Sequence, residues 1–253
     1  MEHAQGQQKW LTMIPYWMSR TQLMLGDDKV NALINKHVLV VGLGGVGGIC
    51  AEMIARAGVG KMTIVDNDKV DLSNANRQVA ALHSTEGQLK ASVMGERLKD
   101  INPLIDLTVL PTYLENEKIP QLLSEGQFDY AVDCIDTLGP KTYFIKACKE
   151  LQIPIVTSLG AGGKVNPSLV QVTDIAKTYQ CTLAKHVRKR LRGMGITHGL
   201  KVVFSPEEID ESRVVVTEKA FPKKSIIGTI SYMPAIFGCT VASVVIRDLM
   251  EGV

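Results

Sequence analysis

Short apolar runs alternate with longer amphipathic segments through the first two thirds of the chain. Five runs have the length and β-branched content of buried strands, at residues 38–41, 62–65, 105–110, 130–134 and 153–158. Between them, apolar residues recur with a helical period over residues 46–57, 85–101, 119–123 and 140–151. This alternation predicts an α/β fold: a Rossmann-like, doubly wound, mostly parallel sheet with helices on both faces.

The pattern changes after residue 160. Val165, Leu169 and Val172 alternate with polar residues around a proline turn, which predicts a β-hairpin. A helix is expected over residues 182–194, with an apolar stripe, and further strands over residues 201–204 and 213–217. These elements predict an antiparallel extension at the C-terminal side of the sheet.

The two ends of the chain have their own patterns. Residues 1–36 are predicted to form short helices anchored by Trp10, Ile14, Tyr16, Trp17 and Leu23. Residues 226–246 carry no charge and are long enough to span a bilayer, but glycines, a serine and Pro234 interrupt them. We therefore expect a buried terminal helix over residues 234–250 and no integral membrane span.

The chain length suits one domain. We divide its 253 residues into a helical arm (1–36), a nucleotide-binding core (37–174), a basic helix with a crossover region (175–225) and the terminal helix (226–253).

The strongest local pattern is strand, glycine turn, helix, strand and acid over residues 37–66. Gly42, Gly44 and Gly47 form G-x-G-x-x-G, with Gly45 beside them, and Asp66 ends the second strand. Glycines let the backbone approach a phosphate, the following helix start attracts its charge, and the acid can bind ribose hydroxyls. The pattern predicts a nucleotide site; the alternative is a tight glycine turn without a ligand.

Positive charge is concentrated in one segment. The chain carries a net charge of +2, yet residues 175–206 hold seven Lys or Arg and no acid, which leaves −5 for the rest. On the expected helix, four of these cations share one face: Lys185, Arg188, Lys189 and Arg192. Such a stripe suits a polyanionic partner, although it could also be a solvated helix face.

Cysteine usage excludes common metal and disulfide scaffolds. The five cysteines are scattered and none forms C-x-x-C, so neither a zinc site nor a disulfide framework is predicted. We expect a protein of the reducing cytoplasm.

Polar residues after the second and fourth strands favour a triphosphate over NAD. Asn74, Arg77, Gln78 and Lys90 follow Asp66 closely, and an Arg fork with a Lys charge suits the three phosphates of ATP. Asp136, just after the fourth strand, can hold Mg²⁺. Alternatively, Arg77 or Lys90 could be solvated surface charges, and Asp136 could cap the next helix. Asp133 is interpreted as a strand-end residue.

Four motifs in order, GLGGVGG, IVDNDKVDLSNANRQ, a following Lys and DCIDT, resemble the E1-like adenylate-forming family. The resemblance implies that Gly44 and Gly45 approach the phosphates, Asp66 binds ribose, Asn74, Arg77 and Lys90 hold the triphosphate, and Asp136 binds Mg²⁺. It also implies a homodimer in which Arg20 reaches the partner's ATP.

Within this family, four segments resemble the tRNA threonylcarbamoyladenosine dehydratase branch: residues 157–178, the basic helix after them, residues 201–207 and the apolar tail. That resemblance implies ATP-dependent adenylation of the threonyl carboxylate in tRNA, followed by cyclisation, with Arg77, Lys90 and Asp136 as the catalytic groups. Lys164 is a further candidate to touch substrate.

Other functions remain open at this point. One is adenylation of the C-terminal glycine of a ubiquitin-like sulfur carrier, which the missing zinc cysteines disfavour. Cys181 lies where a thioester cysteine would be expected, but its neighbours do not resemble such a site. The others are a scaffold or sulfur-relay partner, such as one for a cysteine desulfurase, and an NAD-dependent enzyme.

Overall fold

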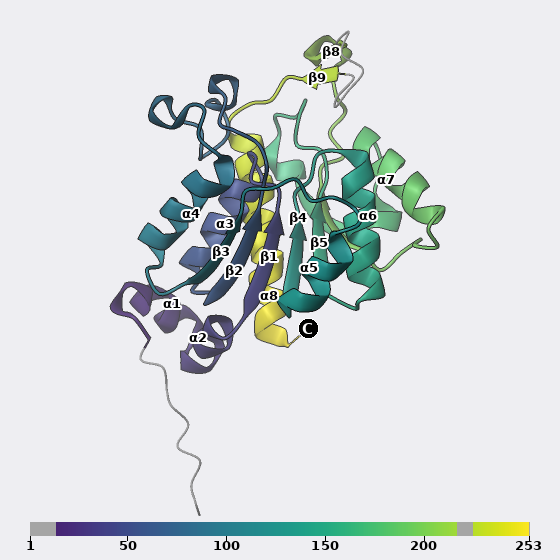
Figure 1. Ribbon diagram of the computed structural model, residues 1–253. Coiled ribbons are helices and arrows are strands. Elements are labelled where there is room, and N and C mark those ends of the chain that lie inside the picture. Colours follow the sequence, from purple (N-terminus) through teal and green to yellow (C-terminus); the bar gives the residue numbers. More distant parts are fainter. Residues whose placement is uncertain (1–13, 217–224, 253) are drawn as a thin grey trace, which may run out of the picture.

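A seven-stranded sheet with strand order β3-β2-β1-β4-β5-β7-β6 forms the centre of the molecule (Figure 1). The computed structural model describes residues 14–216 and 225–252. The strands are β1 (His37–Val41), β2 (Lys61–Val65), β3 (Asp106–Leu110), β4 (Tyr130–Asp133), β5 (Ile155–Ser158), β6 (Gln171–Asp174) and β7 (Lys201–Phe204). All neighbours are parallel except β6 and β7. The predicted mostly parallel α/β sheet is confirmed, and its order reverses between β1 and β4, where such sheets bind ligands.

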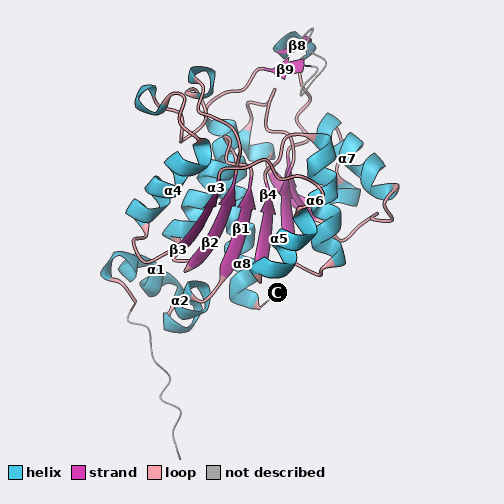
Figure 2. Cartoon of the chain, viewed as in Figure 1, coloured by secondary structure: helices cyan, strands magenta, loops and turns pink. Residues whose placement is uncertain are grey.

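Each face of the sheet has its own apolar core. Val38 and Val40 belong to one cluster and Leu39 and Val41 to the other, because successive side chains of a strand point to opposite faces. The first cluster is covered by α3 (Gly47–Arg56), α4 (Lys90–Ile101) and α8 (Tyr232–Glu251), and the second by α5 (Ile119–Gly126), α6 (Leu138–Glu150) and α7 (Thr182–Arg192) (Figure 2). The helices therefore cover both faces, as predicted.

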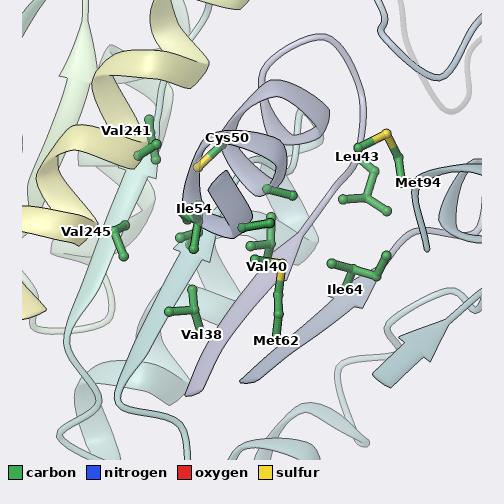
Figure 3. Packing of buried hydrophobic residues seen from close by; sticks show 14 of the residues in the cluster. Val38, Val40, Leu43, Cys50, Ile54, Met62, Ile64, Met94, Val241 and Val245 are labelled. Carbon is green, nitrogen blue, oxygen red and sulfur yellow. The ribbon is translucent and has the colours of Figure 1, made fainter. Parts of the chain in front are cut away.

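The terminal helix α8 is part of the core. Val241 and Val245 face Ile54 of α3 and Val38 of β1 (Figure 3). Gly238 permits close packing, because a Cβ there would lie 2.5 Å from the carbonyl oxygen of Val46. By length and composition α8 could cross a membrane, but 56% of its apolar window is buried inside the protein, which fits the predicted buried helix.

The N-terminal helices are η1 (Tyr16–Met18), α1 (Ser19–Leu25) and α2 (Asp27–Ile34). The predicted anchors Tyr16 and Leu23 are wrong, since they are 92% and 84% exposed, and Trp17 is also exposed. Met18 is the buried anchor instead: it lies against Gly58, where a Cβ would clash with its side chain. Trp10 lies outside the described residues, and Ile14 is half-buried.

The structure corrects two other predictions. The helix expected from residue 85 begins only at Lys90, after η3 (His83–Thr85), because Gly87 has a φ of +77° and Leu89 pairs with Lys69 in a β-bridge. The expected local hairpin is also wrong: after η4 (Pro167–Leu169), β6 pairs with the distant β7.

Short elements complete the fold. Strands β8 (Val214–Val216) and β9 (Ser225–Ile227) form a separate antiparallel sheet, of which only β8 was predicted. The remaining 3₁₀ turns are η2 (Leu72–Asn74), η5 (Ile175–Lys177) and η6 (Glu211–Arg213).

Candidate nucleotide-binding site

The glycine loop between β1 and α3 contains two kinds of glycine. Gly42 has a φ of +88°, and a Cβ on Gly47 would lie 1.7 Å from the carbonyl oxygen of Gly42, so both are required for the loop to fold. At Gly45 a Cβ would lie 2.9 Å from Pro234. At Gly44, by contrast, the nearest atom to a Cβ is Nε2 of Gln78 at 3.8 Å. The open space beside Gly44 is therefore where a phosphate can approach the backbone.

Asp66, at the end of β2, fixes this loop. Its two carboxylate oxygens accept hydrogen bonds from the backbone N–H groups of Leu43 (2.6 Å) and Asp68 (2.8 Å). Burial raises the pKa of Asp66, and the two amides oppose this shift. Each oxygen keeps a lone pair, so the carboxylate holds the loop and can still accept a ribose hydroxyl.

Lys90 begins α4 beside this acid. Its Nζ lies 2.9 Å from a carboxylate oxygen of Asp68, and its side chain is 6% exposed against 62% for that of Asp68. Lys90 is therefore no solvated surface charge, which excludes that alternative. An ammonium group held at the carboxyl edge of the sheet can balance phosphate charge.

The turn from Asn74 to Gln78 forms the next wall. Arg77 Nη1 donates to the carbonyl oxygen of Ser73 (2.9 Å) and to Oδ1 of Asn76 (2.8 Å). Asn74 is half-buried, and its backbone carbonyl accepts from the N–H of Arg77. Gln78 has a buried Oε1 without a hydrogen-bond partner among the described residues. A buried orphan oxygen is costly, and a bound ligand or water can supply its donor.

Asn76 is a site residue that sequence reasoning missed. While its Oδ1 accepts from Arg77, its Nδ2 donates to the carbonyl oxygen of Thr229, 2.9 Å away and just before α8. The motif NANRQ contains it, but nothing local in that motif distinguishes it from a turn residue, because its partner is 153 positions away.

A buried ion pair supports the loop that carries Asp136. Lys141 Nζ lies 2.7 Å from Asp133, both side chains are fully buried, and Asp133 also accepts the backbone N–H of Ile135. Burial raises the pKa of Asp133, and the Lys141 ammonium opposes this shift. Asp133 is a strand-end residue, as interpreted. Asp136 is exposed, two residues before α6 begins.

The donor set fits Mg²⁺ held with phosphate oxygens. Among the described residues, no cluster of three or more His, Cys, Asp or Glu side chains could cage a metal. Mg²⁺ is usually bound by one or two carboxylates, with waters and phosphates completing its shell. Asp136 is the carboxylate that we expect to contribute, and this assignment stays a prediction.

Other predicted residues lie elsewhere. Arg20 is exposed on α1 (Ser19–Leu25), and this helix lies at the end of the sheet where β1 begins, opposite the glycine loop (Figure 1). Cys181 is 5% exposed and precedes α7. Lys164 is 1% exposed and donates to the carbonyl oxygen of Glu207 (2.6 Å), while burial lowers its pKa. In the described structure, Lys164 therefore supports its loop.

The cations of the basic helix α7 differ in their exposure and contacts. Lys185, Lys189 and Arg192 are exposed, as expected for a binding face. Arg188 instead donates to the carbonyl oxygen and the hydroxyl of Thr178, so its guanidinium is partly used within the protein. Arg190 was missed as a candidate because it lies outside the predicted stripe.

A Rossmann-like sheet with a glycine loop, an acid after β2 and cations at its carboxyl edge defines a nucleotide-binding protein. The chain belongs to the ThiF family, whose model matches residues 18–251.

Within this family, the chain is similar to proteins of two kinds. The chain is 37% identical to the tRNA threonylcarbamoyladenosine dehydratase of Bacillus subtilis, over 93% of this chain and 95% of that protein. It resembles the crystal structure of the Escherichia coli tRNA N6-threonylcarbamoyladenosine dehydratase, TcdA, in complex with ATP, with a TM-score of 0.83 and 34% identity over 95% of this chain and 98% of that one. The sulfur carrier protein ThiS adenylyltransferase of Escherichia coli is 34% identical over 57% of this chain and 59% of that protein.

Proposed function

We propose that the protein is an ATP-dependent tRNA threonylcarbamoyladenosine dehydratase. The observation that carries this proposal is the open approach to Gly44, where the nearest atom to a Cβ is Nε2 of Gln78, together with Lys90, which Asp68 holds beside Asp66 at the end of β2. The likeness to dehydratases over nearly the whole chain, including a structure with ATP, supports the same function.

The reaction activates a carboxylate. The threonyl carboxylate attacks the α-phosphorus of ATP, and pyrophosphate leaves as an acyl-adenylate forms. The side chain's own carbamoyl group then closes on the activated carbonyl and loses a proton, AMP leaves, and the nucleoside has lost water overall. No enzyme nucleophile is required, which agrees with the burial of Cys181.

The protein residues act by position and charge. Gly44 and Gly45 admit the phosphates, Asp66 receives the ribose, and Asn74, Arg77, Gln78 and Lys90 hold the triphosphate. Mg²⁺, held by Asp136 and phosphate oxygens, would neutralise charge that develops on the leaving pyrophosphate. Because α1, which carries Arg20, lies at the end of the sheet opposite the glycine loop, we propose a homodimer in which Arg20 serves the partner's ATP.

tRNA is the proposed macromolecular partner, bound through part of the basic face of α7. The enzyme would act in the cytoplasm, where a reducing environment suits its free cysteines. A cysteine desulfurase or sulfur-acceptor partner remains a secondary proposal.

Adenylation of a sulfur carrier is the second candidate function. It is favoured by the likeness to the ThiS adenylyltransferase, which covers little more than half of the chain.

Pyrophosphate release tests the choice between the two. We expect release that requires ATP, Mg²⁺ and tRNA bearing threonylcarbamoyladenosine, and none with the same tRNA lacking that modification. Release that instead requires a small carrier protein with a Gly-Gly tail would replace the dehydratase by the adenylyltransferase.

A further inference from the structure

A groove lies between the start of α6 and one side of α7. It is shallow and open to solvent, has a volume of about 450 Å³ and is lined by Leu138, His186, Lys189, Arg190, Gly193 and Met194. Five of these six residues come from α7 or its end, at spacings of three and four that place them on one side of the helix. The sixth, Leu138, is the first residue of α6.

The groove lies close to the carboxyl edge of the sheet, where the proposed nucleotide site is. Leu138 is only two residues beyond Asp136, the predicted metal ligand at the carboxyl end of β4. Arg190 reaches the same point, because its Nη1 lies 4.0 Å from where a Cβ on Gly139 would be. The N-terminus of the 13-residue helix α6 adds a partial positive charge to this wall.

The two sides of α7 are chemically different. Val187 and Leu191 face the core. Arg188 and Arg192 line a small cavity of about 90 Å³ with Ile175 and Ile196, where Arg188 is held by Thr178. On the groove side, Lys189, Arg190 and His186 are all exposed, and no acidic residue occurs anywhere in residues 175–206.

Groove chemistry matches an unpaired nucleic acid strand. Cations supply phosphate contacts, while Leu138 and Met194 give an apolar surface against which a base can pack. We infer that this groove, and not the whole basic face of α7, seats the single-stranded loop of the tRNA and leads the modified nucleotide to the ATP site. This inference rests on the proposed function and assigns its RNA-binding residues.

Charge reversal tests the assignment with a control on the same helix. Lys189→Glu and Arg190→Glu change the groove, and Lys185→Glu changes an exposed α7 lysine outside it. Affinity is measured with full-length modified tRNA over a series of salt concentrations. We expect each groove variant to bind about tenfold more weakly and with a shallower salt dependence, and Lys185→Glu to change affinity less than about twofold.

Equal losses in all three variants would overturn the groove, because they would indicate a diffuse electrostatic surface. Unchanged binding in both groove variants would also overturn it. ATP affinity, measured alongside, should be that of the unaltered protein, and its loss would show that the groove variants act through the nucleotide site.

Product formation separates this inference from the proposed function. If the unaltered protein cyclises the nucleoside while the groove variants keep its KM for tRNA, only the groove is wrong. If the unaltered protein forms no cyclised nucleoside, the proposed function fails, whatever the groove binds.

Discussion

At the scale of single residues, the site depends on side chains whose partners fix their direction. Asp66 holds the glycine loop, Asp68 holds Lys90, and Asn76 holds Arg77. The residue types were predictable from the sequence for Asp66, Arg77 and Lys90. Asn76 was not, because its importance comes from a carbonyl group in a distant segment.

Lys90 should affect catalysis far more than folding. Lys90→Ala removes an ammonium group from the phosphate site, so we expect the rate of tRNA-dependent pyrophosphate release to fall about 100-fold. Its partner Asp68 is 62% exposed and can be hydrated, so the free energy of unfolding should fall by less than about 1 kcal/mol. A variant with ordinary turnover would remove Lys90 from the mechanism.

Asn76 offers a matched pair of substitutions. Its amide orientation is set by its neighbours, since only Oδ1 can accept from Arg77 and only Nδ2 can donate to Thr229. Asn76→Asp keeps the acceptor for Arg77, whereas Asn76→Ala removes it. We expect the alanine variant to bind ATP about five- to tenfold more weakly, a loss of about 1 kcal/mol, because Arg77 loses its acceptor. The aspartate variant sets a carboxylate oxygen against the carbonyl oxygen of Thr229 and adds negative charge near the triphosphate, so we expect it to bind ATP no better than the alanine variant. Isothermal titration with ATP measures both, and an unchanged affinity of the alanine variant would contradict the role given to Asn76.

At the scale of elements, strands and their following turns were predictable because burial and glycine content are local properties. The start of α4 and the pairing of β6 were not, since one depends on Gly87 and a bridge and the other on a strand beyond α7. The N-terminal anchors were also predicted wrongly, because an apolar residue type does not show which side chain is buried: Met18 is buried and Tyr16 is exposed.

The glycine loop makes the clearest prediction at this scale. Gly47→Ala would place a Cβ 1.7 Å from a carbonyl oxygen, so we expect it to destabilise the fold by about 3 kcal/mol or more. Gly44→Ala meets no atom closer than 3.8 Å and should leave the free energy of unfolding within about 1 kcal/mol.

The affinity for ATP should fall about tenfold or more in the Gly44→Ala protein, because the added methyl group occupies the space through which the phosphate approaches. Denaturant unfolding and ATP titration together distinguish these two effects. Normal ATP affinity in a folded Gly44→Ala protein would mean that the phosphate does not approach this glycine.

At the scale of the whole molecule, polar contacts join the terminal helix to strands of the sheet. Tyr130 donates to Asp248 of α8 (2.7 Å), and Lys201 of β7 pairs with the same carboxylate.

His37, at the start of β1, is buried, and its Nε2 lies 2.9 Å from Thr63 Oγ1. Burial lowers the pKa of His37 below its ordinary value of 6.5.

The pH dependence of stability follows from that shift. The unfolded chain binds a proton at His37 more readily than the folded one, so stability is fully present above pH 6.5 and falls as pH drops from there toward the lowered pKa. The pKa of Glu52 lies below its ordinary value of 4.5 in the folded protein. The stability that its carboxylate adds is therefore present above pH 4.5 and is lost only in more acidic solution. His37→Gln should therefore flatten the loss of unfolding free energy between pH 7 and pH 5, as measured by urea unfolding. An unaltered slope would assign the pH dependence to other groups.

The central claim is that ATP drives the loss of water from a modified tRNA nucleoside at the carboxyl edge of this sheet. Its most direct measurement is mass analysis of nucleosides after the protein is incubated with Mg²⁺, ATP and tRNA that carries threonylcarbamoyladenosine. We predict a nucleoside lighter by one water, formed only when ATP is present. An unchanged nucleoside, with the protein folded and ATP bound, would contradict the account.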